Sequence, residues 1–134
     1  MKMIKTREDV YLLVSIFYQK IKKDPLLSPI FADNISYKDW SIHINKLTDF
    51  WVTCLFGIPQ FIGNPTKKHL IIDNKFNNEL DQKHFGRWLF LWYSTIDSLF
   101  NCSVAQRAKY MAKNIATSQQ MIIVENRKKN IIFN

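Results

Sequence analysis

The side chains that can take part in the most kinds of chemistry in this chain are its three histidines. His43 lies in an apolar stripe of helical period, between Trp40 and Leu47. His69 follows two lysines, and His84 precedes a second apolar stripe. An imidazole can ligate a metal, move a proton or serve as a hydrogen-bonded core residue. The residues alone favour a core role for His43 and leave His69 open between a ligand and an exposed side chain.

The other reactive residues do not form the patterns of common catalytic or phosphate-binding sites. The glycines, Gly57, Gly63 and Gly86, cannot complete a dinucleotide-binding or P-loop motif. The sequence has no serine nucleophile elbow and no H-E-x-x-H zinc pair, and its carboxylates are not paired by spacing. Cys54 and Cys102 are too few for a disulfide framework or a cysteine zinc site, so we interpret them as reduced thiols.

Length and composition favour one helical domain. A chain of 134 residues, 47% of them hydrophobic, is long enough for one domain with its own core. That core is rich in rings, because the chain has 10 Phe, 5 Tyr and 4 Trp. With 3 Gly and 4 Pro it has few of the residues that an all-β chain of many tight turns requires. We predict a single all-α domain over residues 1–134, with its core in about 7–124 and a flexible tail over 125–134.

The chain is basic, with a formal net charge of +8 at pH 7. Such a surplus suits either a solvated surface or a partner with negative charge. Because the basic residues are spread along the chain and do not alternate with aromatic residues, we interpret them as solvated surface and expect no nucleic acid partner. The first residues lack the apolar stretch of a signal peptide, and no run approaches the roughly 18 apolar residues that span a bilayer. We therefore expect no membrane partner and a cytoplasmic location.

Helix signals divide the first part of the chain. Thr6 and Asp9 have the spacing of a capping box, and the apolar stripe behind them predicts a helix over residues 7–23. Pro25 ends this helix, because the residue before a proline leaves helical geometry. The short apolar stretch 26–31 is broken by a second proline, which is typical of a buried corner and not of a strand.

The next signals predict two further helices. One begins at Ser36, with Asp39 as its capping partner, and Gly57 supplies the left-handed residue that closes it. After a loop, Asn64 followed by Pro65 is the arrangement that favours a helix start, and it predicts a short helix.

Two long helices follow a polar loop over residues 72–80. In the first, apolar residues recur every three or four positions from Phe85 to Leu99. The second begins near Ser103, with Gln106 as its capping partner. Its repeated alanines would let another helix or a flat ligand approach closely.

Several short motifs occur in a fixed order along residues 10–118. They are Ile16-Phe17-Tyr18-Gln19-Lys20-Ile21, Asp24-Pro25-Leu26-Leu27-Ser28-Pro29-Ile30-Phe31, Trp40-x-x-His43, Phe50-Trp51, Gly63-Asn64-Pro65, Lys68-His69 and His84-Phe85-x-x-Trp88-Leu89. An alanine-rich last helix follows them. No single motif is specific, but the ordered set resembles the group III truncated haemoglobins. The chain has no Gly-Gly pair, which fits group III and not groups I and II.

The resemblance implies an all-α, globin-like fold, a shortened two-over-two helical sandwich that encloses haem b (iron protoporphyrin IX). His69 matches the proximal histidine, the metal ligand that binds the haem iron. Tyr18, His43 and Trp88 match the polar distal residues, on the side where the gas binds. His84 is the fallback iron ligand and otherwise has a structural or haem-edge role.

Further positions match haem contacts by the same resemblance. Phe31 matches a ring that packs on the haem face, and Leu47 matches the apolar residue above the iron. The lysines placed to meet the haem propionates, with solvated lysine as the alternative, are Lys46, Lys67 and Lys68. The aromatic residues expected to line the two haem faces are Phe31, Phe50, Trp51, Phe85, Trp88 and Trp92.

The expected function is binding of diatomic gases (O2, NO, CO) at the haem iron. In a dry site, hydrogen-bond donors such as the Tyr18 hydroxyl and the Trp88 indole N–H each retain a ligand by about 1–3 kcal/mol. Slow escape suits scavenging, sensing or redox chemistry better than oxygen transport. Two enzymatic alternatives stay open, nitric oxide oxidation supported by a reductase and peroxidase-like cleavage. A basic helical interaction protein without a cofactor is the remote alternative.

Overall fold

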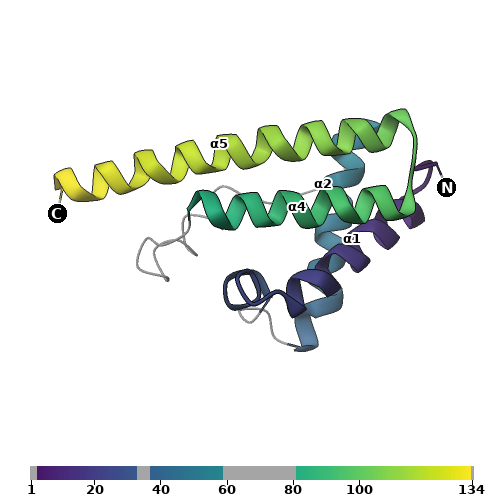
Figure 1. Cartoon of the computed structure of the whole chain (residues 1–134), viewed down its shortest axis with the longest axis horizontal. Coiled ribbons are helices and arrows are strands. Elements are labelled where there is room, and N and C mark those ends of the chain that lie inside the picture. Colours follow the sequence, from purple (N-terminus) through teal and green to yellow (C-terminus); the bar gives the residue numbers. More distant parts are fainter. Residues whose placement is uncertain (1–2, 33–36, 59–80, 134) are drawn as a thin grey trace.

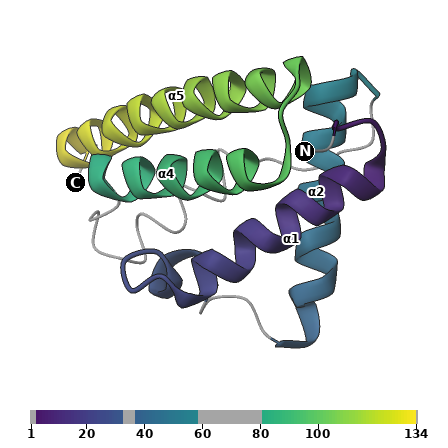
Figure 2. The ribbon, with the colours of Figure 1, turned by 45° about the vertical axis from the view of Figure 1, so that its right-hand side comes forward.

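Four long helices form two layers. The computed structural model describes residues 3–32, 37–58 and 81–133, and every regular element in these ranges is helical. The long helices are α1 (Arg7–Lys23), α2 (Trp40–Phe56), α4 (Gln82–Leu99) and α5 (Ser103–Phe133). α1 packs across α2, α4 lies antiparallel beside α5, and the two pairs pack on each other (Figure 1 and Figure 2). The all-α class and the two-over-two arrangement are confirmed.

α1 has the two ends that the sequence predicted. Thr6 Oγ1 accepts a hydrogen bond from the backbone N–H of Asp9 at 3.3 Å, and the Asp9 carboxylate accepts one from the backbone N–H of Thr6 at 3.1 Å. This reciprocal capping box satisfies two amides that lack a helical acceptor. The helix ends at Lys23, because Asp24 adopts the extended conformation before Pro25.

The corner after α1 is a single π-helical turn, η1 (Ser28–Ala32). Asp24 holds the entry to this turn, because its Oδ2 accepts from the backbone N–H of Leu26 at 3.2 Å and of Leu27 at 3.0 Å. The Asp24 side chain thus supplies the hydrogen-bond acceptor for both backbone amides, which need no partner strand. The predicted buried corner is confirmed.

The first described turn of the second predicted helix is a 3-10 turn and not α-helical. A three-residue 3-10 helix, η2 (Tyr37–Asp39), precedes it, so the α-helix begins at Trp40 with Asp39 as its N-cap. A tighter turn at a helix start is common and accounts for the difference. The end is as predicted, because Gly57 has a φ of 69°, in the left-handed region that glycine adopts without strain.

α5 begins at Ser103, as the sequence predicted, but its cap and its length differ from the prediction. Its start is capped by Cys102, whose Sγ accepts from the backbone N–H of Ala105 at 3.3 Å, and not by the expected pair Ser103 and Gln106. The helix continues through residues 125–133, beyond the predicted core. No Gly or Pro occurs after position 86, so the common helix-ending residues are absent from this segment. Although α5 has 31 residues, no helix in the described ranges is apolar enough over its length to cross a bilayer.

Two apolar clusters hold the layers together. The larger one joins α1, α2, α4 and the first half of α5, where three alanines are fully buried: Ala105, Ala108 and Ala112. Their small side chains let α5 approach α4 closely, as the alanine repeat predicted. The smaller cluster lies between η1, the start of α4 and the second half of α5, and consists of Ile30, Phe85, Ala116 and Ile123.

Some predictions fall outside the described residues. They are the helix start at Ser36, the short helix that begins at Asn64 and Pro65, and the loops on either side of it. These, and the flexibility of the tail, stay predictions.

Candidate functional site

Tyr18 and His43 meet where α1 crosses α2. Their rings are edge-on, with centroids 5.2 Å apart and planes at 85°. Tyr18 is buried, and the Nε2 atom of His43 is buried as well. Burial raises the pKa of the Tyr18 hydroxyl above its ordinary value of 10.0, because the charged phenolate is disfavoured away from water. The hydroxyl therefore keeps its proton at neutral pH and can act as a hydrogen-bond donor.

Phe17 links this pair to Trp88 on α4. The Phe17 ring is edge-on to Tyr18 at 5.3 Å and to Trp88 at 5.7 Å between centroids. Trp88 is half-buried, and within the described ranges its indole N–H has no protein acceptor. We call Tyr18, His43 and Trp88 the polar ring group, since each combines an apolar body with a polar tip. Its members come from three helices, with Tyr18 and Trp88 packed on the buried Phe17 and His43 packed on Tyr18.

Trp92, one turn after Trp88, belongs to the core instead. It is 0% exposed and stacks on Trp51, which is 3% exposed, with centroids 4.5 Å apart. Its indole N–H donates to the backbone carbonyl of Ala108 at 3.2 Å. Because protein atoms already enclose this inner tryptophan pair, Trp51 and Trp92, its rings have almost no surface left for a haem. The prediction that they line the haem is wrong, and Phe85 is enclosed in the same way in the smaller cluster.

Trp40 is a neighbour of the polar ring group that sequence analysis did not assign to the site. Its ring centroid lies 6.0 Å from that of Tyr18 and 6.0 Å from that of His43. The Nζ atom of Lys22 lies 4.3 Å from the centroid of the Trp40 ring, in the range of a cation–π interaction. The signal for Trp40 was its position three residues before His43 on one helical stripe. The contact with Lys22 depends on how α1 and α2 cross, which no local pattern reports.

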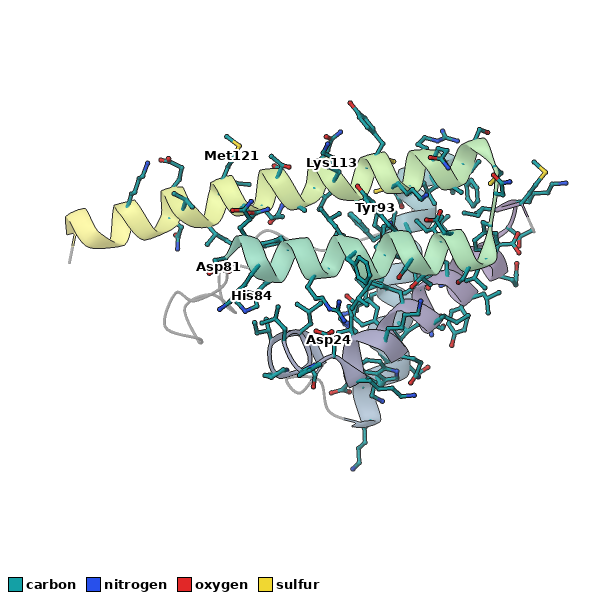
Figure 3. The ribbon with its side chains drawn as sticks, in the orientation of Figure 1. Asp24, Asp81, His84, Tyr93, Lys113 and Met121 are labelled. Carbon is teal, nitrogen blue, oxygen red and sulfur yellow. The ribbon has the colours of Figure 1, made fainter. Side chains whose placement is uncertain are left out.

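An ion pair ties α4 to the end of α1 directly beside Trp88. Arg87 Nε donates to Asp24 Oδ1 at 2.7 Å, and the Asp24 side chain is almost fully buried. Figure 3 shows Asp24 on the side of α4 that faces the end of α1. The Arg87 guanidinium also lies over the Phe90 ring, 5.2 Å from its centroid. Because Arg87 precedes Trp88 in the chain, this pair fixes that part of α4 relative to α1.

Half-buried apolar side chains supply surface that is only partly covered by protein. They come from α2, α4 and α5 and pack on the larger cluster: Leu47, Phe50, Leu89, Met111 and Ile115. Leu47, one of the predicted haem contacts, lies one turn after His43 on α2. Apolar walls with a few polar tips are what a flat, mostly apolar cofactor requires of its site.

His84 is buried at the start of α4 and takes part in a helix cap. Its Nδ1 accepts from the backbone N–H of Asp81 at 3.1 Å, and Asp81 Oδ1 accepts from the backbone N–H of Lys83 at 3.0 Å. Figure 3 shows both residues at this end of α4. One imidazole nitrogen is thus engaged in holding the helix start, which agrees with the predicted structural role of His84.

The other predicted site residues are placed only in part. Lys46 is exposed on α2. The backbone of Phe31 belongs to η1, but its side chain lies outside what the structure describes. Lys67, Lys68 and His69 also lie outside the described ranges, so the proximal ligand stays a prediction.

A two-over-two helical fold with polar rings between its layers places the protein in the globin-like class, and two known proteins narrow this class. The chain is 32% identical over 114 residues to the group 3 truncated hemoglobin ctb of Campylobacter jejuni, which covers 81% of this chain and 86% of that protein. The crystal structure of group III truncated hemoglobin from Campylobacter jejuni is similar with a TM-score of 0.76 and 30% identity, covering 92% of this chain and 95% of that one. No protein-family model matches the chain. The chain belongs to the group III truncated haemoglobins.

Membership in this family implies haem-based gas binding. The described residues fit a haem in two respects. Half-buried apolar side chains on three helices offer walls for a macrocycle, and the polar ring group offers hydrogen-bonding tips next to them on the same cluster. The donor set contains a hydroxyl, an imidazole and an indole, which suits a small polarisable ligand better than a charged one.

Proposed function

We propose that this protein binds O2, NO and CO at a haem b whose iron is held by His69, with the polar ring group on the ligand side. The proposal is supported above all by one connected set of rings, in which Tyr18 and Trp88 pack on Phe17 and His43 packs on Tyr18, in a chain of the group III family. The haem supplies the iron at which a diatomic gas binds. The protein holds the cofactor, excludes water and donates hydrogen bonds to the bound gas.

The three polar rings differ in what they can donate. The Tyr18 hydroxyl keeps its proton because burial raises its pKa, and the Trp88 indole can only donate. His43 donates or accepts according to its tautomer. Each donor in a dry site retains a polarised ligand by about 1–3 kcal/mol, so two donors acting together slow its escape. Slow escape favours scavenging, sensing or redox chemistry over oxygen transport.

The contacts that hold the cofactor come from η1, from the first turns of α2 and from the segment around His69. Leu47 and Phe31 contact the haem face. Lys46, Lys67 and Lys68 pair with the propionates, and the exposure of Lys46 beside Leu47 suits a cation at the haem edge.

The two free cysteines bear on the cellular location of the protein. Cys54 and Cys102 are unpaired thiols, which is typical of a reducing compartment, and we place the protein in the cytoplasm. Where the haem turns over NO or peroxide, a separate reductase supplies the electrons.

Haem retention tests the proposal. Wild-type protein reconstituted with haemin shows an intense Soret band, and His69→Ala loses it. His84→Ala is the matched control and keeps the band, because His84 caps a helix. Wild type without a Soret band would contradict haem binding itself. A band that survives in His69→Ala and disappears in His84→Ala would move the iron ligand to His84.

A further inference from the structure

The Trp40 ring packs beside both rings of the Tyr18–His43 pair. Tyr18 is buried, His43 and Trp40 are half-buried, and Lys22, which lies over the Trp40 ring, is exposed. The Trp40 centroid is equally far, 6.0 Å, from those of Tyr18 and His43, with planes at 70° and 44°. Trp40 thus packs against both rings at once.

Helical spacing explains how four side chains from two helices meet here. Lys22 follows Tyr18 by four residues on α1, and Trp40 precedes His43 by three residues on α2, so each pair lies on one face of its helix. Where the helices cross, Tyr18 faces His43 and Lys22 faces Trp40. The two contacts therefore form successive layers of one interface.

Trp40 lies at the beginning of a helix, where the backbone is held less firmly than in the helix interior. It is the first residue of α2 and follows the short 3-10 helix η2, so the amide groups of its turn lack the hydrogen bonds of a helix interior. The Lys22 ammonium over the ring face, 4.3 Å from its centroid, supplies an attraction from α1. This contact holds the beginning of α2 against the end of α1.

We propose that Trp40, restrained by Lys22, is a positioning residue that holds the His43 imidazole against Tyr18 and thereby limits passage of gas to and from the site. The proposal rests on the proposed function, because it concerns ligand movement past the polar ring group. The three ring centroids form a triangle with sides of 5.2, 6.0 and 6.0 Å, so Trp40 packs beside both rings and bounds the space into which the His43 ring can turn. When Trp40 is held less firmly, the His43 ring turns more often, and the gas then enters and leaves the site faster.

The test compares Lys22→Met and Lys22→Arg in the haem-loaded protein, with Lys23→Met as control. Methionine keeps most of the apolar stem and removes the charge, whereas arginine restores a cation over the ring. Lys23 lies in the same last turn of α1 and is exposed, so its variant reproduces any loss of charge at the helix end. CO rebinding after flash photolysis gives the association rate, ligand replacement gives the dissociation rate, and the C–O stretch reports the polar surroundings of the ligand.

Lys22→Met should raise both the association and the dissociation rate by about two- to fivefold, the factor expected from one exposed cation–π contact. It should also broaden the C–O stretch, because His43 samples more orientations. Lys22→Arg and Lys23→Met should stay close to wild type. A merely structural role of Lys22 would lower the thermal midpoint without moving either rate. Trp40→Leu, which removes the ring itself, should give the same pattern with larger changes.

Equal rates in Lys22→Met and Lys23→Met would overturn the proposal. Tyr18→Phe, measured alongside, separates this failure from failure of the proposed function. If Tyr18→Phe speeds ligand dissociation while Lys22→Met changes nothing, only the positioning role is wrong. If neither variant changes a rate, the polar ring group is not the ligand site and both proposals fall.

Discussion

Trp88 and Trp92 lie one turn apart on α4 with nearly parallel rings, 6° between planes and 6.3 Å between centroids. Both contact Phe17 edge-on, but they belong to different regions. Trp92 is enclosed in the inner tryptophan pair, and its N–H is satisfied by a backbone carbonyl. Trp88 is half-buried in the polar ring group, and its N–H has no acceptor in the part of the chain that the structure describes.

The difference separates stabilising rings from ligand-binding rings. A buried indole with a satisfied donor contributes packing and one hydrogen bond to the fold. The half-buried Trp88 indole N–H lies at the edge of the core, where it can donate to water or to a ligand. Substitutions in the inner tryptophan pair should therefore change the free energy of unfolding, and those in the polar ring group should change ligand kinetics.

Trp92→Ala should have the largest effect on stability. Removing a fully buried indole leaves a cavity and deletes one hydrogen bond to the Ala108 carbonyl, and the expected loss is about 3–5 kcal/mol in the free energy of unfolding. Urea denaturation of the apoprotein measures it. Trp88→Ala is the control and should lose clearly less, because that ring is half-buried. Equal losses would remove the distinction between the two regions.

Asp24→Ala should have the next largest effect, because this carboxylate ties α1 to α4 beside the polar ring group. The substitution leaves two backbone amides and the Arg87 guanidinium without their acceptor, at an expected cost of about 1–3 kcal/mol. Asp97→Ala is the matched control, since Asp97 pairs with Lys109 but is 62% exposed, against 3% for Asp24. A loss in Asp97→Ala as large as in Asp24→Ala would show that burial does not decide the effect.

Alkaline pH should weaken the fold through Tyr18. Its pKa in the folded protein lies above the ordinary 10.0, so the unfolded chain loses this proton first as the pH rises. The contribution is fully present below pH 10 and declines above it, with a slope of about 1.4 kcal/mol per pH unit. Tyr18→Phe should show a shallower decline than wild type, and the exposed Tyr110→Phe should follow wild type. Identical slopes in all three would mean that Tyr18 ionises as easily folded as unfolded.

Local signals in the sequence predicted those parts of the fold that local chemistry decides. The capping box of Thr6 and Asp9 and the stop at Pro25 gave α1 its two ends, because each depends on contacts within a few residues. The 3-10 turn before α2 was not predicted, since the sequence does not say whether a first turn is 3-10 or α. The cap of α5 was wrong because Cys102, a weak acceptor, was not considered for that role.

The candidate site was predictable only through resemblance to a family. Spacing alone favoured a core role for His43, and it gave no reason to join Tyr18 with Trp88. The periodicity could not tell that Trp92 points into the core while Trp88, one turn earlier, stays half-buried. The contact between Lys22 and Trp40 was missed because it depends on the crossing of two helices far apart in the sequence.

The oxygen dissociation rate of the haem-loaded protein tests the role of the polar ring group most directly. Wild type, Tyr18→Phe and the exposed control Tyr110→Phe differ only in one hydroxyl. Loss of the buried donor should speed dissociation by about 5- to 150-fold in Tyr18→Phe, while Tyr110→Phe keeps the wild-type rate. Equal rates in wild type and Tyr18→Phe would contradict the assignment of the polar ring group to the ligand site.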